Sequence, residues 1–99
     1  MPRYLTLLNF TPQGAKALDK SVDRSHAFRT SAASLGAKVE AIYRRLGQFD
    51  GAVILDDPDD QTASGLMVAL SRAGNVQTRT TRLYDENEFA SIVATAAKI

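Results

Sequence analysis

Cysteine is absent from the 99-residue sequence, which excludes disulfide bonds, thiolate metal sites and thiol nucleophiles together. Long apolar runs are absent too, since no segment approaches the roughly 20 residues that a membrane-spanning helix needs. The first ten residues, MPRYLTLLNF, contain too short an apolar run for a signal peptide and no small-residue cleavage site. We therefore expect a cytoplasmic protein with no membrane partner.

Net charge is small as well. Twelve basic residues face eleven acidic ones, so the formal net charge of +1 gives no general attraction to nucleic acid, and no nucleic-acid partner is expected. No repeat, linker or low-complexity tract divides the chain, and its length suits a single domain over residues 1–99. No pattern typical of a metal site is present, and we expect neither a metal nor a cofactor.

Four segments have the composition of strands. Residues 3–10 alternate, as do residues 38–46, where Val39 lies on one face and Ile42 on the other. The segment 51–56 is apolar without alternation, which is typical of a strand covered on both faces. A polar, threonine-rich strand is expected at 76–84.

Helices are indicated by capping residues and apolar stripes. Thr11 caps a short helical turn, Ser21 a second helix that ends before Gly36, and Asp57 a third, followed by Pro58 at the first helical position. The capping box of the last helix is Asp85 with Glu88. The stripes expected to face the core are Phe28, Ala32 and Leu35; Ala63, Leu66, Met67, Leu70 and Ala73; and Phe89, Ile92, Val93 and Ala96.

The order of these elements predicts an α+β fold: a ferredoxin-like βαββαβ plait with an extra C-terminal helix and the antiparallel sheet order 4-1-3-2. All helices of this plait lie on one side of the sheet. The central strands, 3–10 and 51–56, are nevertheless apolar on both faces. We expect a second copy of the chain to cover the outer face, sheet on sheet; the alternative is that the C-terminal helix folds across it.

Three stretches of the sequence resemble the GYD-domain family: YLTLLNFTPQG, LGQFDGAVILDDPDD, and AGNVQTRTTR followed by EFASIVA. They occur in the family's order over nearly the whole chain. The resemblance implies membership of the dimeric α+β-barrel group, in which two ferredoxin-like sheets pack face to face. It implies no assigned activity, although the wider fold group includes cofactor-free monooxygenases and isomerases.

The family's signature glycine and aspartate correspond to Gly47 and Asp50, but its tyrosine is Phe49 here. Gly47 is expected to take a positive φ. Asp50 is expected to accept hydrogen bonds from loop amides or to pair with Arg45. The alternative is that Asp50 is a general base, which would need a raised pKa and the help of other groups.

An acidic run and a single histidine are further candidates for a polar site. The acidic run Asp56, Asp57, Asp59 and Asp60 lacks the spacing of a calcium loop and is interpreted as helix capping. The only histidine, His26, lies about 200° around the helix from Phe28, so it is expected to be solvated.

The sequence thus favours a homo-oligomeric binding or assembly module that holds a small apolar or aromatic ligand. A cleft between sheet and helices is the expected place for it. The candidate ligand-binding residues are Tyr4, Asn9, Asn75 and Arg79. The alternative is a cofactor-independent enzyme, isomerase- or monooxygenase-like, with Asp50 as base; its candidate catalytic residues are Asp50, Tyr43 and His26.

Overall fold

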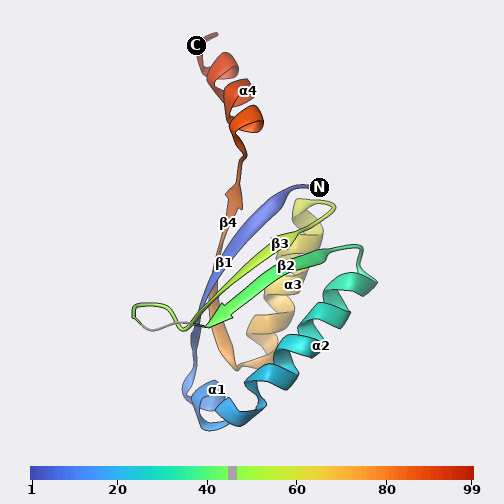
Figure 1. Ribbon diagram of the computed structural model, residues 1–99, viewed down its shortest axis with the longest axis vertical. Helices are drawn as coiled ribbons and strands as arrows, with labels where there is room; N and C mark the ends of the chain where they lie inside the picture. Colours follow the sequence, from blue (N-terminus) through green and yellow to red (C-terminus); the bar gives the residue numbers. More distant parts are fainter. Residues whose placement is uncertain (45–46) are drawn as a thin grey trace.

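The computed structural model describes residues 1–44 and 47–99 (Figure 1). Its elements, in chain order, are β1 (Arg3–Phe10), α1 (Pro12–Lys16), the 3-10 turn η1 (Leu18–Lys20), α2 (Ser21–Ser34), β2 (Lys38–Arg44), β3 (Gly51–Asp56), α3 (Asp60–Ala73), β4 (Val76–Leu83) and α4 (Glu86–Ala96). The expected end of the second strand, residues 45–46, lies outside the described residues, and so does the expected pairing of Asp50 with Arg45.

The strands form one antiparallel sheet in the order β2-β3-β1-β4, which is the predicted order read from the other edge. Helices α2 and α3 lie together on one face of this sheet, here called the inner face (Figure 1). The predicted α+β plait with an additional C-terminal helix is therefore confirmed. The other face of the sheet, the outer face, carries neither α2 nor α3.

Alternation along the two central strands decides which side chains are buried. Tyr4, Leu8, Val53 and Leu55 point to the inner face and pack against Leu66 and small residues of the helices. Their neighbours along the strands point to the outer face and remain partly exposed, namely Leu5, Leu7, Ala52 and Ile54. One apolar set of each central strand thus faces away from the helices, as the sequence predicted.

Strand β2 departs from the simple alternation that the sequence suggested. The register between β2 and β3 shifts between Val39 and Ala41, which marks a β-bulge. Because of this extra residue, Val39 and Ile42 both pack against the core instead of lying on opposite faces. Arg44 shares the face of Ile42, which brings its guanidinium to α2.

Several predicted caps are confirmed. The hydroxyl of Thr11 accepts a hydrogen bond from the amide of Gly14, and Asp85 and Glu88 form the expected capping box of α4. Gly47 has a positive φ of 113°, and Gly74 ends α3 in the left-handed conformation.

Two predicted caps are wrong. The N-cap of α3 is Asp59, whose carboxylate accepts from the amide of Thr62, while Asp57 is completely buried two residues earlier. The loop after β3 is therefore longer than expected, and Pro58 precedes the helix. Ser21 is not the N-cap of α2, since η1 runs directly into α2 and Ser21 is already helical.

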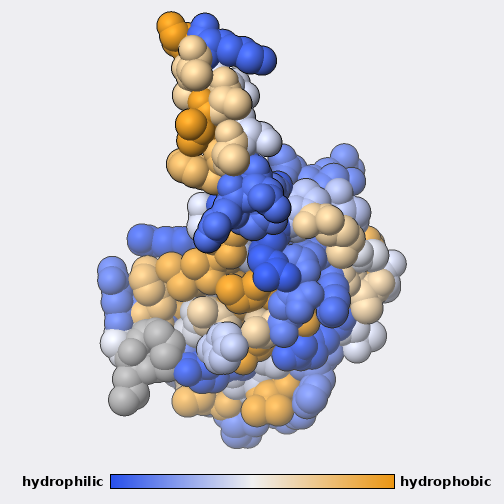
Figure 2. Space-filling view, turned by 45° about the horizontal axis from the view of Figure 1, so that its top comes forward, coloured by the Kyte–Doolittle hydropathy of each residue, from blue (hydrophilic) through white to orange (hydrophobic). Residues whose placement is uncertain are grey.

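The position of α4 is the largest departure from expectation. It extends away from the body beyond the end of β4 (Figure 1) and gives the chain a longest dimension of 51 Å. Apolar side chains along it are exposed, with Phe89 57% and Val93 53% accessible (Figure 2). The predicted contact of Phe89, Ile92, Val93 and Ala96 with the core is thus wrong, and α4 does not cover the outer face. None of the described helices has the length and apolar character to span a membrane.

Candidate functional site

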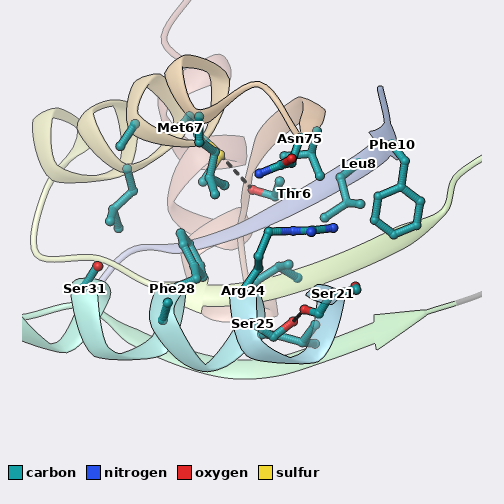
Figure 3. A pocket seen from close by; sticks show the side chains of 18 of the residues that line it. Thr6, Leu8, Phe10, Ser21, Arg24, Ser25, Phe28, Ser31, Met67 and Asn75 are labelled. Atoms are coloured by element: carbon teal, nitrogen blue, oxygen red, sulfur yellow. Dashed lines mark hydrogen bonds between the residues drawn. The ribbon is translucent and has the colours of Figure 1, made fainter. Parts of the chain in front are cut away.

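A cavity of about 370 Å³ lies between the inner face of the sheet and helices α2 and α3 (Figure 3). Its size falls at the lower end of the range for sites that hold small organic molecules. The side chains around it come from every layer of the fold: Thr6, Leu8, Phe10, Ile42, Arg44, Val53 and Val76 from the sheet; Ser21, Arg24, Ser25, Ala27, Phe28 and Ser31 from α2; and Leu66, Met67, Ala69, Leu70 and Ala73, with Asn75 beyond it, from α3.

The cavity exists because the inward side of α2 carries small polar residues where a packed core would need large apolar ones. Ser21, Ser25 and Ser31 line the cavity from this helix, and only Phe28 reaches across as a large apolar side chain. Helix α3 behaves differently, since Leu66 packs fully into the core. Because α3 contributes large side chains to the interior and α2 mostly small ones, a space is left between the two helices and the sheet.

The polar group deepest in the cavity wall is already satisfied. Thr6 is fully buried in the middle of β1. Its hydroxyl lies 2.8 Å from that of Thr80 on β4 and 3.6 Å from the sulfur of Met67 on α3 (Figure 3). Thr6 therefore joins sheet and helix without presenting a free donor to a ligand.

Two arginines lie at the end of the cavity nearest α1. Arg24 donates through Nη1 to the carbonyl oxygen of Ala17 at 2.9 Å, while its Nη2 is buried without a hydrogen-bond acceptor. Arg44 is more exposed and donates to the hydroxyls of Ser21 and Ser25 at 2.8 and 2.7 Å. Arg44 is thus held against the first two turns of α2, and Arg24 reaches back from α2 to the end of α1.

Helix α1 packs tightly against the turn after α3, where Asn75 lines the cavity. A β-carbon on Gly14 would lie 2.0 Å from the carbonyl oxygen of Asn75, a distance that no side chain tolerates. The same oxygen accepts from the amide of Thr11 at 3.1 Å, and the side chain of Asn75 accepts from Gln13 at 3.0 Å. The close approach explains why glycine is needed at position 14.

The predicted catalytic residues are not brought together by the fold. Asp50 accepts a hydrogen bond from the amide of Phe10 at 2.8 Å, so its carboxylate fastens the loop before β3 to the end of β1. Tyr43 is 61% exposed on the outer face, opposite Ala52, whereas His26 is exposed on α2 on the other side of the sheet. None of the three lines the cavity.

Among the predicted ligand-binding residues, Asn75 alone lines the cavity. Asn9 accepts from the backbone amide of Asp50 at 3.1 Å, which supports the same loop. Arg79 is exposed on the outer face opposite Leu7. Tyr4 is buried in the core, where its hydroxyl donates to the carboxylate of Asp60.

The pKa values of Tyr4, Asp57 and Asp59 are shifted by burial and by hydrogen bonds near the start of α3. The hydrogen bond to Asp60, together with burial, raises the pKa of Tyr4 to about 12. Burial also raises the pKa of Asp57, whose two carboxylate oxygens have no hydrogen-bond partner, and the nearby charges of Asp56 and Asp59 add to this. The capping bond from Thr62 lowers the pKa of Asp59. The acidic run therefore contains both a cap and an isolated buried carboxyl group.

Arg24 was missed in the sequence, although a signal for it was present. It lies four residues before Phe28 and eight before Ala32, so it continues the stripe that faces the sheet. A charged side chain in line with an apolar stripe either extends past the core to solvent or stays between sheet and helix and binds a polar group there. The guanidinium of Arg24 stays between sheet and helix.

The described residues contain no group of three or more histidine, aspartate or glutamate side chains arranged to hold a metal ion. No curated protein matches the chain. The model of the GYD domain family matches residues 4–93, which is most of the 99-residue sequence. The chain therefore belongs to the GYD-domain family.

Proposed function

We infer that this protein is a homo-oligomeric binding module that holds a small, mainly apolar molecule between its sheet and its two packed helices. The observation that carries this proposal is the cavity itself, which is walled largely by aliphatic and aromatic side chains and has its two charged groups at one end. Pockets of this composition are the usual form of small-molecule sites. A domain of this size that served only as a scaffold would gain stability by filling the space.

The homo-oligomeric part of the proposal is supported by two uncovered apolar surfaces. The outer face presents Leu5, Leu7 and Ile54, and α4 presents Phe89 and Val93 to solvent. Because α4 points away from the sheet, the chain does not bring these surfaces together (Figure 1). A second copy supplies apolar surface for both, and burial of each Å² contributes roughly 25 cal/mol before the costs of association.

An enzyme that uses Asp50 as a base is the alternative function, and it has less support. The carboxylate of Asp50 already accepts a backbone amide, and Asp50 lies outside the cavity lining. A base needs a substrate proton within hydrogen-bond reach, together with groups that stabilise the product charge. Tyr43 and His26, which would have to assist it, lie on opposite sides of the sheet.

The binding proposal is tested by narrowing the cavity. Ala69 on α3 lines its rim, and its neighbour Val68 is 63% exposed and outside the lining. With 2-naphthoate as a fluorescent probe, Ala69→Phe is expected to weaken binding at least about tenfold, whereas Val68→Phe leaves it unchanged. Equal binding by wild type and both variants, all folded by circular dichroism, would contradict the proposed location.

A further inference from the structure

The charged groups of the cavity and most of its polar ones lie at one end. Arg24, Arg44, Ser21 and Asn75 lie where α2 starts, next to α1, whereas Phe28, Ser31 and the side chains of α3 surround the remainder (Figure 3). A ligand in this space meets apolar walls along most of its length and two cationic groups at one end. The cavity is thus suited to an amphipathic molecule rather than to a uniformly apolar one.

The guanidinium of Arg24 has an unused donor inside the protein. It lies in the space between α2 and the sheet, below Leu8 (Figure 3), and Nη2 has neither solvent contact nor an acceptor among the described residues. A buried donor without a partner costs about 1–3 kcal/mol, and more when it is charged. Proteins rarely leave such a group unpaired unless a ligand or water satisfies it.

No acidic side chain balances this end of the cavity. Among the described residues, neither Arg24 nor Arg44 has a carboxylate within 4.0 Å, and the cavity lining contains no aspartate or glutamate. Other arginines of the same chain do pair, since Arg3 contacts Asp56 and Arg82 contacts Glu88, each at 2.9 Å. Arg29, Arg72 and Arg79 also have no carboxylate within 4.0 Å among the described residues, but all three are exposed to solvent. Arg24 differs from them because part of its unpaired guanidinium is buried.

We propose that the ligand is an apolar monocarboxylate whose carboxylate accepts from the guanidinium of Arg24 and whose body lies against Phe28 and Met67. This proposal rests on the binding function inferred above and adds the chemical class of the ligand. A carboxylate matches a guanidinium in shape and charge. A phosphate would call for a larger set of donors, such as several free backbone amides. The start of α2 does line the cavity through Ser21, but η1 precedes it and the amide of Ser21 already donates to the carbonyl oxygen of Leu18.

The test compares 2-naphthoate with 2-naphthamide, which has nearly the same shape but no charge, by isothermal titration calorimetry on the full chain. Wild type is expected to bind the acid at least about tenfold more tightly than the amide, because hydrogen bonds to charged groups contribute more than neutral ones. Arg24→Gln is expected to remove this preference while amide binding persists. Arg29→Gln, on the same helix but outside the cavity lining, changes the net charge equally and is expected to keep the preference.

The outcomes separate the two levels of the proposal. Equal binding of acid and amide by wild type would overturn the carboxylate class and leave the binding function standing. No binding of either compound would overturn both. Arg24→Lys is the control for misfolding, since it retains the charge and is expected to recover part of the preference for the acid. An Arg24→Gln variant that keeps the full preference would show that Arg24 does not bind the carboxylate. Decanoate against decan-1-ol repeats the comparison with an aliphatic body and distinguishes aromatic from fatty acids.

Discussion

Helices α3 and α4 begin in the same way and end in opposite environments. Each starts at an aspartate that accepts a hydrogen bond from an amide three residues later, Asp59 for α3 and Asp85 for α4. Each also carries an apolar stripe. Yet Leu66 of α3 is 3% exposed, whereas Phe89 of α4 is 57% exposed.

The difference comes from how each helix is connected. Helix α3 lies between β3 and β4, both of which belong to the sheet, so both of its ends are fixed and its stripe must face the inner surface. Helix α4 is fixed at one end only, through β4 and the ion pair of Arg82 with Glu88 at 2.9 Å. Caps and stripes therefore specify a helix, and the strands on either side specify where it packs.

The largest expected effect on the free energy of unfolding distinguishes the apolar stripe of α3 from that of α4. Leu66→Ala removes a fully packed side chain and is expected to lower the free energy of unfolding by about 2–5 kcal/mol at every protein concentration. Phe89→Ala is expected to change unfolding only through the association of copies, so its effect should depend on protein concentration. Urea denaturation over a range of concentrations measures both. An equally large, concentration-independent loss from Phe89→Ala would place α4 against its own chain.

A smaller effect is expected from the acidic segment that leads into α3. The pKa of Asp57 is higher in the folded chain than its ordinary value of 3.8, because burial disfavours the charged form. The folded state therefore binds the proton more tightly, and the contribution of Asp57 to stability falls as pH rises through the folded pKa. Asp57→Asn is expected to raise the free energy of unfolding at pH 7 by about 1–3 kcal/mol.

The gain from Asp57→Asn should disappear as pH falls below 3.8, where Asp57 is protonated in both states. Thermal unfolding of wild type and variant across this pH range measures the difference. Asp23→Asn, at an exposed position of α2, removes the same charge and serves as the control. A stability loss at pH 7 from Asp57→Asn would mean that the charged carboxylate has a partner in solution.

The smallest expected effect concerns the caps. Asp59→Ala is expected to lower the free energy of unfolding of the whole domain by about 1 kcal/mol, since α3 is part of the core. Asp85→Ala removes a similar bond but is expected to reduce helicity in α4 alone. Hydrogen exchange of the α4 amides, measured beside those of β1, distinguishes local fraying from global loss. Faster exchange of β1 amides in Asp85→Ala would contradict the independence of α4.

The sequence predicted the body of the fold well because its signals there are mutually consistent. Leu5 and Leu8 fall on opposite faces of a strand whose side chains alternate. Gly47 and Gly74 occupy positions where φ is positive. The bulge at β2 was not predictable, because an extra residue in a strand leaves no mark in the alternation of short mixed segments. The position of α4 was not predictable either, since an apolar stripe does not say which surface will cover it.

The sequence predicted where the cavity lies, between sheet and helices, but not which polar groups line it. Asn75 was expected to line a cleft between sheet and helices, and it does. Arg24 went unnoticed because isolated charges on helices are usually solvated, and its burial depends on where η1 places the start of α2. Tyr4 was predicted to bind a ligand in the cleft, but its hydroxyl donates to Asp60, which is 56 residues away and connected to it by no local pattern.

Light scattering on protein separated by size tests most directly whether a second copy covers the outer face and α4. Wild type is expected to have at least twice the 10.7 kDa of one chain, and Leu5→Arg, in the middle of the outer face, is expected to reduce the mass to that of a single folded chain. A wild-type protein that remains at 10.7 kDa at every concentration would contradict this account.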